Sequence, residues 1–317
     1  MKAKSTIPAA AKLGLAAAAL TGAALFNRKK TRDAEAETPP IGKFVEIDGV
    51  RLHYIERGSG GQALVMLHGL GSLVQDFLGS GLIDRAAKHY RVIAFDRPGY
   101  GYSGRPGGQF WTPEAQAAMI RAALAKLQIE RPIVLGHSWG TLPALALALE
   151  FADEVAGLVL LSGYYFPSAR PDPILLAGPA VPVLGTVMAN TVSPLIGRAA
   201  RKAVFKQIFA PGPVPESFER SFPAGLSLRP RQIQASAGDA GQLQIASARL
   251  SRRYGGLTMP VAIAAGDGDK VVAYKQAERM HAAVPHSSLR TAAGVGHMIH
   301  WIDPDLVMAA IDEVASG

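Results

Sequence analysis

The feature that most constrains the fold of this chain is a series of short, continuous apolar runs after residue 40. The runs span residues 63–67, 91–95, 132–135, 157–161 and 260–265. Runs of this length without strict alternation of apolar and polar residues are typical of parallel strands buried on both faces. Helical stretches separate most of them, at residues 113–127, 142–151, 273–283 and 304–314. We therefore expect an α/β fold with a mostly parallel central sheet flanked by helices.

Two regions depart from this alternation. Residues 43–47 and 51–56 alternate apolar and polar side chains around Asp48-Gly49, which predicts a β-hairpin. Residues 163–255 lack the buried-strand pattern and are interpreted as a helical lid inserted after the sixth core strand. The predicted organisation is an N-terminal segment (residues 1–40), a core (residues 41–162 and 256–317) and this lid.

The lid begins with an apolar, proline-rich passage at residues 167–189. We expect this part of the lid to line a hydrophobic substrate cleft. The apolar side chains on which this expectation rests are Phe166, Leu175, Leu176, Val181 and Val183. Ordinary packing of the lid against the core would explain the same residues nearly as well.

The composition excludes several classes of site. The 317 residues contain no cysteine, so disulfides, thiolate zinc sites and a cysteine nucleophile are excluded. The histidines do not follow a metal-motif spacing, and we expect no metal and no cofactor. The net charge is +8, but no nucleic-acid-binding motif accompanies it, so we expect no nucleic-acid partner. Most of the excess positive charge lies in residues 1–40 and in the lid, which fits an anionic membrane surface. Lysines and arginines that only keep the protein soluble would explain the charge about as well.

The N-terminal segment is predicted to be an uncleaved membrane anchor. Its apolar run at residues 13–26 is shorter than the ~20 residues that cross a bilayer, but counting from Ile7, with Lys12 snorkelling, reaches that length. A basic cluster at residues 28–32 follows, so contact with a membrane is expected through residues 7–32 and the basic lid. The alternatives are a cleaved export signal, with an A-x-A site at Ala34-Glu35-Ala36, and an amphipathic or disordered tail. Since the first core strand begins near Lys43, residues 1–38 are expected to be removable.

Residues 136–140 read Gly-His-Ser-Trp-Gly and match the motif G-x-S-x-G. An apolar strand precedes the motif and an Ala/Leu-rich helix follows it, which is the context of a nucleophile elbow. Small flanking residues permit a sharp turn that exposes the hydroxyl of Ser138. The alternative is a structural turn that happens to carry a serine.

With three further motifs in the same order, the chain resembles the α/β-hydrolase family over roughly residues 41–317. The residues His68-Gly69-Leu70-Gly71 follow the third strand, like the oxyanion loop of that family. Residues 96–103 read Asp-Arg-Pro-Gly-Tyr-Gly-Tyr-Ser and resemble its D-x-P-G-x-G-x-S turn. Gly296-His297 precedes the final helix. The resemblance implies an α/β-hydrolase fold and a serine hydrolase with an inserted lid.

The resemblance also implies roles for individual residues. Ser138 is expected to be the nucleophile and His297 the general base that takes its proton. The family spacing G-x-x-D selects Asp269 over Asp267 as the carboxylate that orients the imidazole. The backbone N–H groups of Leu70 and Trp139 are expected to form the oxyanion hole.

The other histidines near these motifs are given structural roles. His137 adjoins the nucleophile, but on an elbow its side chain would point away from the hydroxyl. His300 is expected to pack beside the site, and His68 is expected to brace the loop that it begins.

The serine narrows the reaction class. Haloalkane dehalogenases and epoxide hydrolases carry aspartate at this position, so Ser138 favours acyl transfer, and a carboxylic ester hydrolase acting on small to medium apolar substrates is predicted. The alternatives are a proline-iminopeptidase-like aminopeptidase, a cofactor-free haloperoxidase or perhydrolase, a lactonase and a carbon–carbon bond hydrolase. The aminopeptidase is disfavoured, because such enzymes usually carry H-G-G-P-G and need acidic lid residues. A relative that binds a small ligand without turnover is the non-enzymatic alternative.

Overall fold

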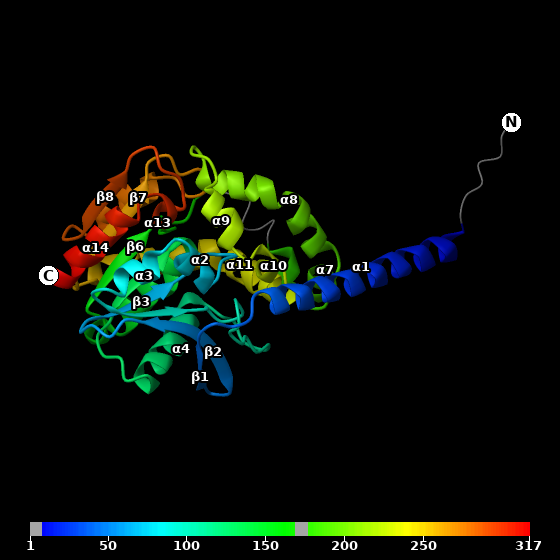
Figure 1. Cartoon of the computed structure of the whole chain (residues 1–317), viewed down its shortest axis with the longest axis horizontal. Helices are drawn as coiled ribbons and strands as arrows, with labels where there is room; N and C mark the ends of the chain where they lie inside the picture. The colour runs from blue at the N-terminus through cyan, green and yellow to red at the C-terminus, as the bar shows by residue number, and fades with distance from the viewer. Residues whose placement is uncertain (1–7, 169–176) are drawn as a thin grey trace.

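The computed structural model describes residues 8–168 and 177–317, and it forms one eight-stranded sheet in the order β1-β2-β4-β3-β5-β6-β7-β8 (Figure 1). The pairs β1–β2 and β2–β4 are antiparallel, and the remaining pairs are parallel. The strands are β1 (Lys43–Ile47), β2 (Val50–Arg57), β3 (Ala63–Leu67), β4 (Arg91–Phe95), β5 (Ile133–His137), β6 (Gly157–Leu161), β7 (Val261–Gly266) and β8 (Ser288–Ala292). The hairpin and the mostly parallel sheet are therefore confirmed.

Helices cover both faces of the sheet, and two apolar cores fill the space between the layers. Along β3, Val65 and Leu67 belong to one core, whereas Leu64 and Met66 belong to the other. Successive strand side chains point to opposite faces, so a strand buried on both sides must be apolar throughout. The core helices are α2 (Val74–Gly79), α3 (Leu82–Ala86), α4 (Pro113–Lys126), α5 (Thr141–Glu150), α12 (Lys275–Ala283), α13 (Ile299–Ile302) and α14 (Pro304–Ser316).

A helical insertion, residues 177–256, separates β6 from β7. Its α-helices are α7 (Leu184–Asn190), α8 (Val192–Phe209), α9 (Glu216–Ser221), α10 (Ala224–Ser227) and α11 (Pro230–Ser251). Short 3-10 turns lie near its two ends, at Gly178–Ala180 and Tyr254–Gly256. The insertion is therefore built from helices alone in the part of the chain that the structure describes.

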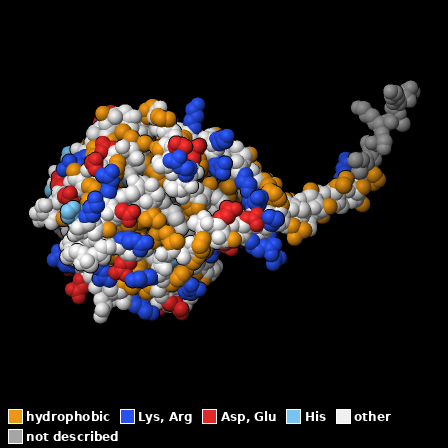
Figure 2. Space-filling view, in the orientation of Figure 1, with side chains coloured by type: hydrophobic (Ala, Val, Ile, Leu, Met, Phe, Trp, Pro, Cys, Tyr) orange, Lys and Arg blue, Asp and Glu red, His pale blue; other side chains and the backbone are white. Residues whose placement is uncertain are grey.

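The N-terminal helix α1 (Ala9–Glu37) projects from the body of the protein (Figure 1). Its 29 residues span about 43 Å at the rise of an α-helix. Its most apolar stretch has a mean hydropathy of 1.6 and is not buried, so by length and composition it could cross a membrane or act as a signal sequence. Apolar side chains gather on the projecting part, and basic ones lie closer to the body (Figure 2).

The second half of α1 packs against the helical insertion. The side-chain amide of Asn27 is buried and donates hydrogen bonds to the backbone oxygens of Asn190 (3.0 Å) and Thr191 (2.6 Å). The guanidinium of Arg198 donates to the Asn27 oxygen at 2.6 Å. An asparagine inside a helix whose side chain is fully bonded to another element indicates a specific docking site.

About two turns further along, Ala34 is buried in a cluster with Leu73 and Leu226. The next residue, Glu35, forms an ion pair of 2.8 Å with the buried Arg229. The predicted boundary at residue 40 is thus wrong in one respect, because residues 27–37 are part of the folded body. The A-x-A sequence lies within the same continuous helix, so cleavage there would remove these contacts.

Candidate active site

A sharp turn joins β5 to α5 and carries Ser138. The backbone of Ser138 has φ = 53°, a left-handed conformation that costs about 1–2 kcal/mol for a residue with a Cβ atom. A Cβ added to Gly140 would lie 2.2 Å from the backbone oxygen of Leu67, and one added to Gly136 would lie 2.6 Å from that of Gly140. Both flanking glycines are therefore required by close packing of backbone, which explains the G-x-S-x-G spacing.

Three side chains from distant segments meet at this turn. The Oγ of Ser138 lies 2.9 Å from Nε2 of His297, and Nδ1 of His297 lies 2.7 Å from Oδ2 of Asp269. His297 and Asp269 are both buried. The second carboxylate oxygen of Asp269 accepts the backbone N–H groups of Val271 (2.7 Å) and Val272 (2.9 Å), which fix its orientation. The structure thus brings together the three predicted residues in hydrogen-bonding order.

Asp267, the alternative carboxylate, lies in a different environment. Its side chain is exposed and accepts the backbone N–H of Gly294 at 2.6 Å. It thereby braces the turn that precedes His297. The structure places Asp269, and not Asp267, against the imidazole.

The predicted oxyanion loop lies directly against the elbow. A Cβ added to Gly69 would be 3.0 Å from the Cβ of Ser138. Leu70 and Trp139, whose N–H groups are the predicted donors, line the same cavity as Ser138. His68 braces the loop, because its Nδ1 bonds the backbone oxygen of Gly69 (2.9 Å) while its Nε2 accepts the backbone N–H of Arg97 (3.1 Å).

A buried polar cluster of Asp76, His137 and His300 lies behind the nucleophile, and Asp76 is the member that the sequence did not predict. The rings of His137 and His300 are 4.5 Å apart, and Nε2 of His300 lies 3.2 Å from the Asp76 carboxylate. The carboxylate also accepts hydrogen bonds from Trp301 (2.7 Å) and Ser72 (2.8 Å). Asp76 belongs to no motif, so only the packing of α2 against α13 reveals it.

Among the residues that the structure describes, Asp76, His137 and His300 are also close enough to be considered as metal ligands, since their donor atoms lie within 4.8 Å of one another. Both oxygens of Asp76 already accept hydrogen bonds, and the Nε2 of His137 lies 3.2 Å from the backbone oxygen of His297. Burial holds the pKa of His137 well below its ordinary value, so this imidazole is neutral. We interpret the cluster as internal support for the loop that carries His297.

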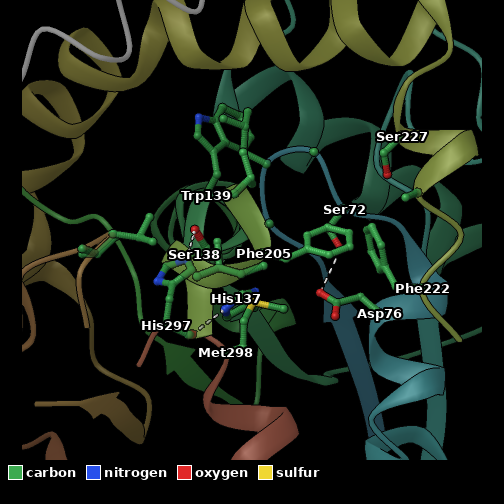
Figure 3. Close-up of a pocket in the computed structure, with 18 of the residues that line it drawn as sticks. Ser72, Asp76, His137, Ser138, Trp139, Phe205, Phe222, Ser227, His297 and Met298 are labelled. Atoms are coloured by element: carbon green, nitrogen blue, oxygen red, sulfur yellow. Dashed lines mark hydrogen bonds between the residues drawn. The ribbon is translucent and has the colours of Figure 1, made fainter. Parts of the chain in front are cut away.

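A cavity of about 370 Å³ opens above Ser138 between the core and the insertion (Figure 3). Ser138, His297, Trp139, Phe205 and Phe222 all line it (Figure 3). Most of the lining is apolar. The apolar side chains that the insertion supplies include Val204, Phe205, Ile208, Phe218, Phe222 and Leu243.

The prediction that the apolar passage at the start of the lid lines the cleft is wrong for the residues that the structure describes. Phe166 packs edge-on against Tyr254, and Val181 and Val183 are 49% and 80% exposed, so none of the three lines the cavity. Leu175 and Leu176 lie outside the described residues. The cavity is lined instead by α8, α9 and the residues that follow them. The sequence signal that could have identified this lining is the helical spacing of Val204, Phe205 and Ile208 in α8.

Acid is expected to destabilise the protein through His68. Burial, together with the charge of Arg97, lowers the pKa of His68 from 6.5 to about 4. Between these pH values the unfolded chain binds a proton at His68 that the folded protein does not bind. The free energy of unfolding is therefore highest above pH 6.5 and decreases as the pH falls towards 4. The free energy of unfolding should fall by about 3 kcal/mol over this range. Urea unfolding at several pH values measures the change.

The control for the pH experiment replaces His68 by glutamine, whose side chain does not bind a proton. His68→Gln should flatten the pH dependence, whereas replacing the exposed His89 by glutamine should leave it unchanged. An identical slope in the wild type and in H68Q would contradict the assignment.

Comparisons with known proteins agree with this architecture. The model of the alpha/beta hydrolase fold family matches residues 62–304. Uncharacterized hydrolase YugF of Bacillus subtilis (strain 168) is 26% identical over 278 residues, which cover 84% of this chain and 95% of that protein. Among solved structures, the esterase EaEST from Exiguobacterium antarcticum has a TM-score of 0.68 at 22% identity and covers 87% of this chain and 100% of its own.

A membrane phospholipase A, described as a bacterial virulence factor, has a TM-score of 0.67 at 20% identity, and the match covers 97% of both chains. At these identities the two solved structures show a common fold. The family model, in contrast, matches most of the sequence directly. The chain belongs to the α/β-hydrolase fold family.

Proposed function

We propose that the protein is a serine hydrolase that cleaves carboxylic esters through an acyl-enzyme. The observation that carries this proposal is the continuous chain of hydrogen bonds from Ser138 through His297 to Asp269. A serine hydroxyl is a weak nucleophile near neutral pH, and an imidazole held at 2.9 Å can take its proton during attack.

In the first half-reaction the Oγ of Ser138 attacks the ester carbonyl while Nε2 of His297 takes the hydroxyl proton. Asp269 stabilises the imidazolium that forms. The carbonyl oxygen becomes an anion, which accepts hydrogen bonds from the N–H groups of Leu70 and Trp139. The imidazolium then gives its proton to the leaving alcohol.

In the second half-reaction a water molecule takes the place of the alcohol. His297 accepts a proton from this water, which attacks the acyl carbonyl, and the proton then returns to the Oγ of Ser138 as the acid leaves. Each step uses the same three side chains, and no cofactor is required.

The cavity supports an apolar acyl group of small to medium size. Its volume of about 370 Å³ lies at the lower end of the range for small-molecule sites. Phe205, Phe218 and Phe222 form its wall on the insertion side. Burial of acyl methylenes against these rings contributes about 0.8 kcal/mol for each CH₂ group.

A membrane lipid ester is a second candidate substrate. One observation favours it: α1 leaves the insertion close to the helices that line the cavity, and it is long and apolar enough to cross a bilayer. The similarity to the membrane phospholipase A extends over 97% of the chain and so includes this helix. Phospholipid hydrolysis is therefore included in the test below.

The aminopeptidase alternative needs a free acidic group beside the cavity, and residues 177–256, the part of the insertion that the structure describes, do not supply one. Asp239 is buried and forms ion pairs with Arg97 (2.7 Å) and Arg105 (3.0 Å), so it is not available for the amino terminus of a substrate. Glu216 and Glu219 do not line the cavity. The lactonase, perhydrolase and carbon–carbon hydrolase alternatives share the proposed chemistry and are separated only by substrate.

Two measurements test the proposal. A fluorophosphonate probe should label the wild type at Ser138, and p-nitrophenyl esters of increasing acyl length should be hydrolysed at rates that depend on the chain length. The same panel of substrates should include a lactone, an amide and a phospholipid, and peracid formation should be assayed separately. Labelling without turnover of any of these substrates would favour the ligand-binding alternative.

We also propose that α1 anchors the protein in a membrane. The full-length chain should sediment with membranes and resist extraction by high salt, because burial of an apolar helix far outweighs surface attraction of ~1 kcal/mol per basic residue. Deletion of residues 1–26 should release a soluble protein of normal stability. Deletion of residues 1–38 should also lower the free energy of unfolding by roughly 2–3 kcal/mol, because the buried Arg229 loses Glu35. Extraction by salt alone would indicate peripheral binding, and equal stability of the two truncated chains would contradict the docking of α1.

A further inference from the structure

Arg97 is a buried cation whose side chain the proposed reaction does not use. It follows β4, and its side chain is 1% exposed. Its charge is balanced by Asp239 of α11, at 2.7 Å, and its Nη1 also donates to the side chain of Gln116 at 2.9 Å. A buried guanidinium is costly unless every donor is bonded, so the partners of the remaining nitrogens show what it is placed to do.

Those partners are backbone oxygens of the oxyanion loop. The Nε of Arg97 donates to the oxygen of His68 at 2.8 Å, and its Nη2 donates to the oxygen of Gly69 at 3.1 Å. A trans peptide group is planar, and its C=O and N–H bonds point in opposite directions. By holding the oxygen of Gly69, Arg97 turns the N–H of Leu70 away from itself. That N–H is one of the two donors assigned to the oxyanion hole.

The second donor residue touches the same guanidinium. The carbon at its centre lies 4.4 Å from the ring centre of Trp139, within the range of a cation–π contact. The indole N–H of Trp139 donates to the backbone oxygen of Asp239 at 3.0 Å. One side chain therefore contacts both segments that supply oxyanion donors, and the helical insertion closes the network.

We propose that Arg97 is a positioning residue that orients both donors of the oxyanion hole, with Asp239 of the helical insertion holding its guanidinium in place. This inference rests on the proposed serine-hydrolase function. Preorganised donors stabilise a developing oxyanion because they need no reorientation when charge forms. Loss of Arg97 should therefore affect the transition state more than the binding of the ground-state ester.

Arg105 provides a matched control. It forms an ion pair of 3.0 Å with the other oxygen of the same Asp239, and it also donates to the backbone oxygen of Pro98. It makes no hydrogen bond to His68 or Gly69 among the described residues. Arg97→Met and Arg105→Met thus each remove one cation from Asp239, but only the first frees the oxyanion loop.

The test compares kcat, KM and the affinity for a trifluoromethyl ketone, which forms an oxyanion adduct with a catalytic serine. In the full-length chain, R97M should lower kcat for a short p-nitrophenyl ester on the order of 100-fold. The affinity for the ketone should fall by a similar factor, whereas KM should change less than about threefold. R105M should change all three by less than about threefold. Arg97→Lys is the second variant, to be used if R97M does not fold. It keeps the charge but lacks the forked guanidinium, so it should show the same pattern with a smaller loss.

A folded R97M or R97K with the kinetics of R105M would overturn the positioning role. So would a loss of thermal stability with no change in ketone affinity. If the wild type itself neither hydrolyses the ester nor binds the ketone, the proposed function fails, and the positioning role fails with it. The wild-type measurement therefore separates the two failures.

Discussion

Replacement of Ser138 by alanine is expected to reduce ester hydrolysis on the order of 1,000-fold or more. The substitution removes the only atom that can form the acyl-enzyme and leaves the elbow unchanged, because alanine has the same Cβ and meets the same backbone constraint at φ = 53°. Steady-state hydrolysis of a short p-nitrophenyl ester measures the loss, and circular dichroism verifies that the variant is folded. Fluorophosphonate labelling should disappear together with activity.

The exposed Ser59 supplies the control for this experiment. Ser59→Ala should keep both turnover and labelling, since Ser59 precedes β3 whereas the oxyanion loop follows the opposite end of that strand. Residual turnover near the wild-type rate in a folded S138A protein would remove Ser138 from the mechanism.

Asp269→Asn is expected to lower kcat on the order of 10,000-fold, a loss typical of this substitution in a serine triad. The two N–H groups of Val271 and Val272 hold one oxygen of the side chain, so an amide at this position would present its NH₂ group to Nδ1 of His297. The imidazole would then carry its proton on Nε2, facing Ser138, and could not act as the base. The same kinetic assay measures the effect.

Asp267→Asn is the matched comparison, since only Gly268 separates the two aspartates. Its carboxylate oxygen bonds the backbone of Gly294, which an asparagine oxygen can also accept, so kcat should change less than about threefold. If D267N proved to be the inactive variant and D269N the active one, the orienting carboxylate would be Asp267.

The sequence predicted the sheet and the elbow because both depend on local patterns. An apolar residue at every position of β3 identifies a strand buried on both faces, whatever packs on it. Two glycines around Ser138 identify a turn in which the backbone passes too close to its neighbours for a side chain. The fold is confirmed by the family match, whereas the roles of Ser138, His297 and Asp269 remain predictions that the experiments above test.

Other predictions failed where the answer depended on which distant segments pack together. An apolar passage at residues 177–189 could line a cavity, pack on the core or face outwards, and its composition is the same in each case. The residues of α8 line the cavity because that helix lies across the elbow, and Val183 is exposed because nothing described covers it. The end of α1 was assigned to the anchor segment, but Asn27 and Glu35 have partners more than 150 residues away.

The sequence by itself determined the α/β class and the order in which the proposed catalytic residues occur along the chain. Strand burial, turn geometry and motif spacing act over a few residues, so they can be read from neighbouring letters. Only the tertiary structure decided which side chains line the cavity, where Asp76 sits and how Arg97 is held. Arg97 and Asp239 are 142 residues apart, and their pairing follows from the need to balance a buried charge, which arises only after folding has removed both groups from water.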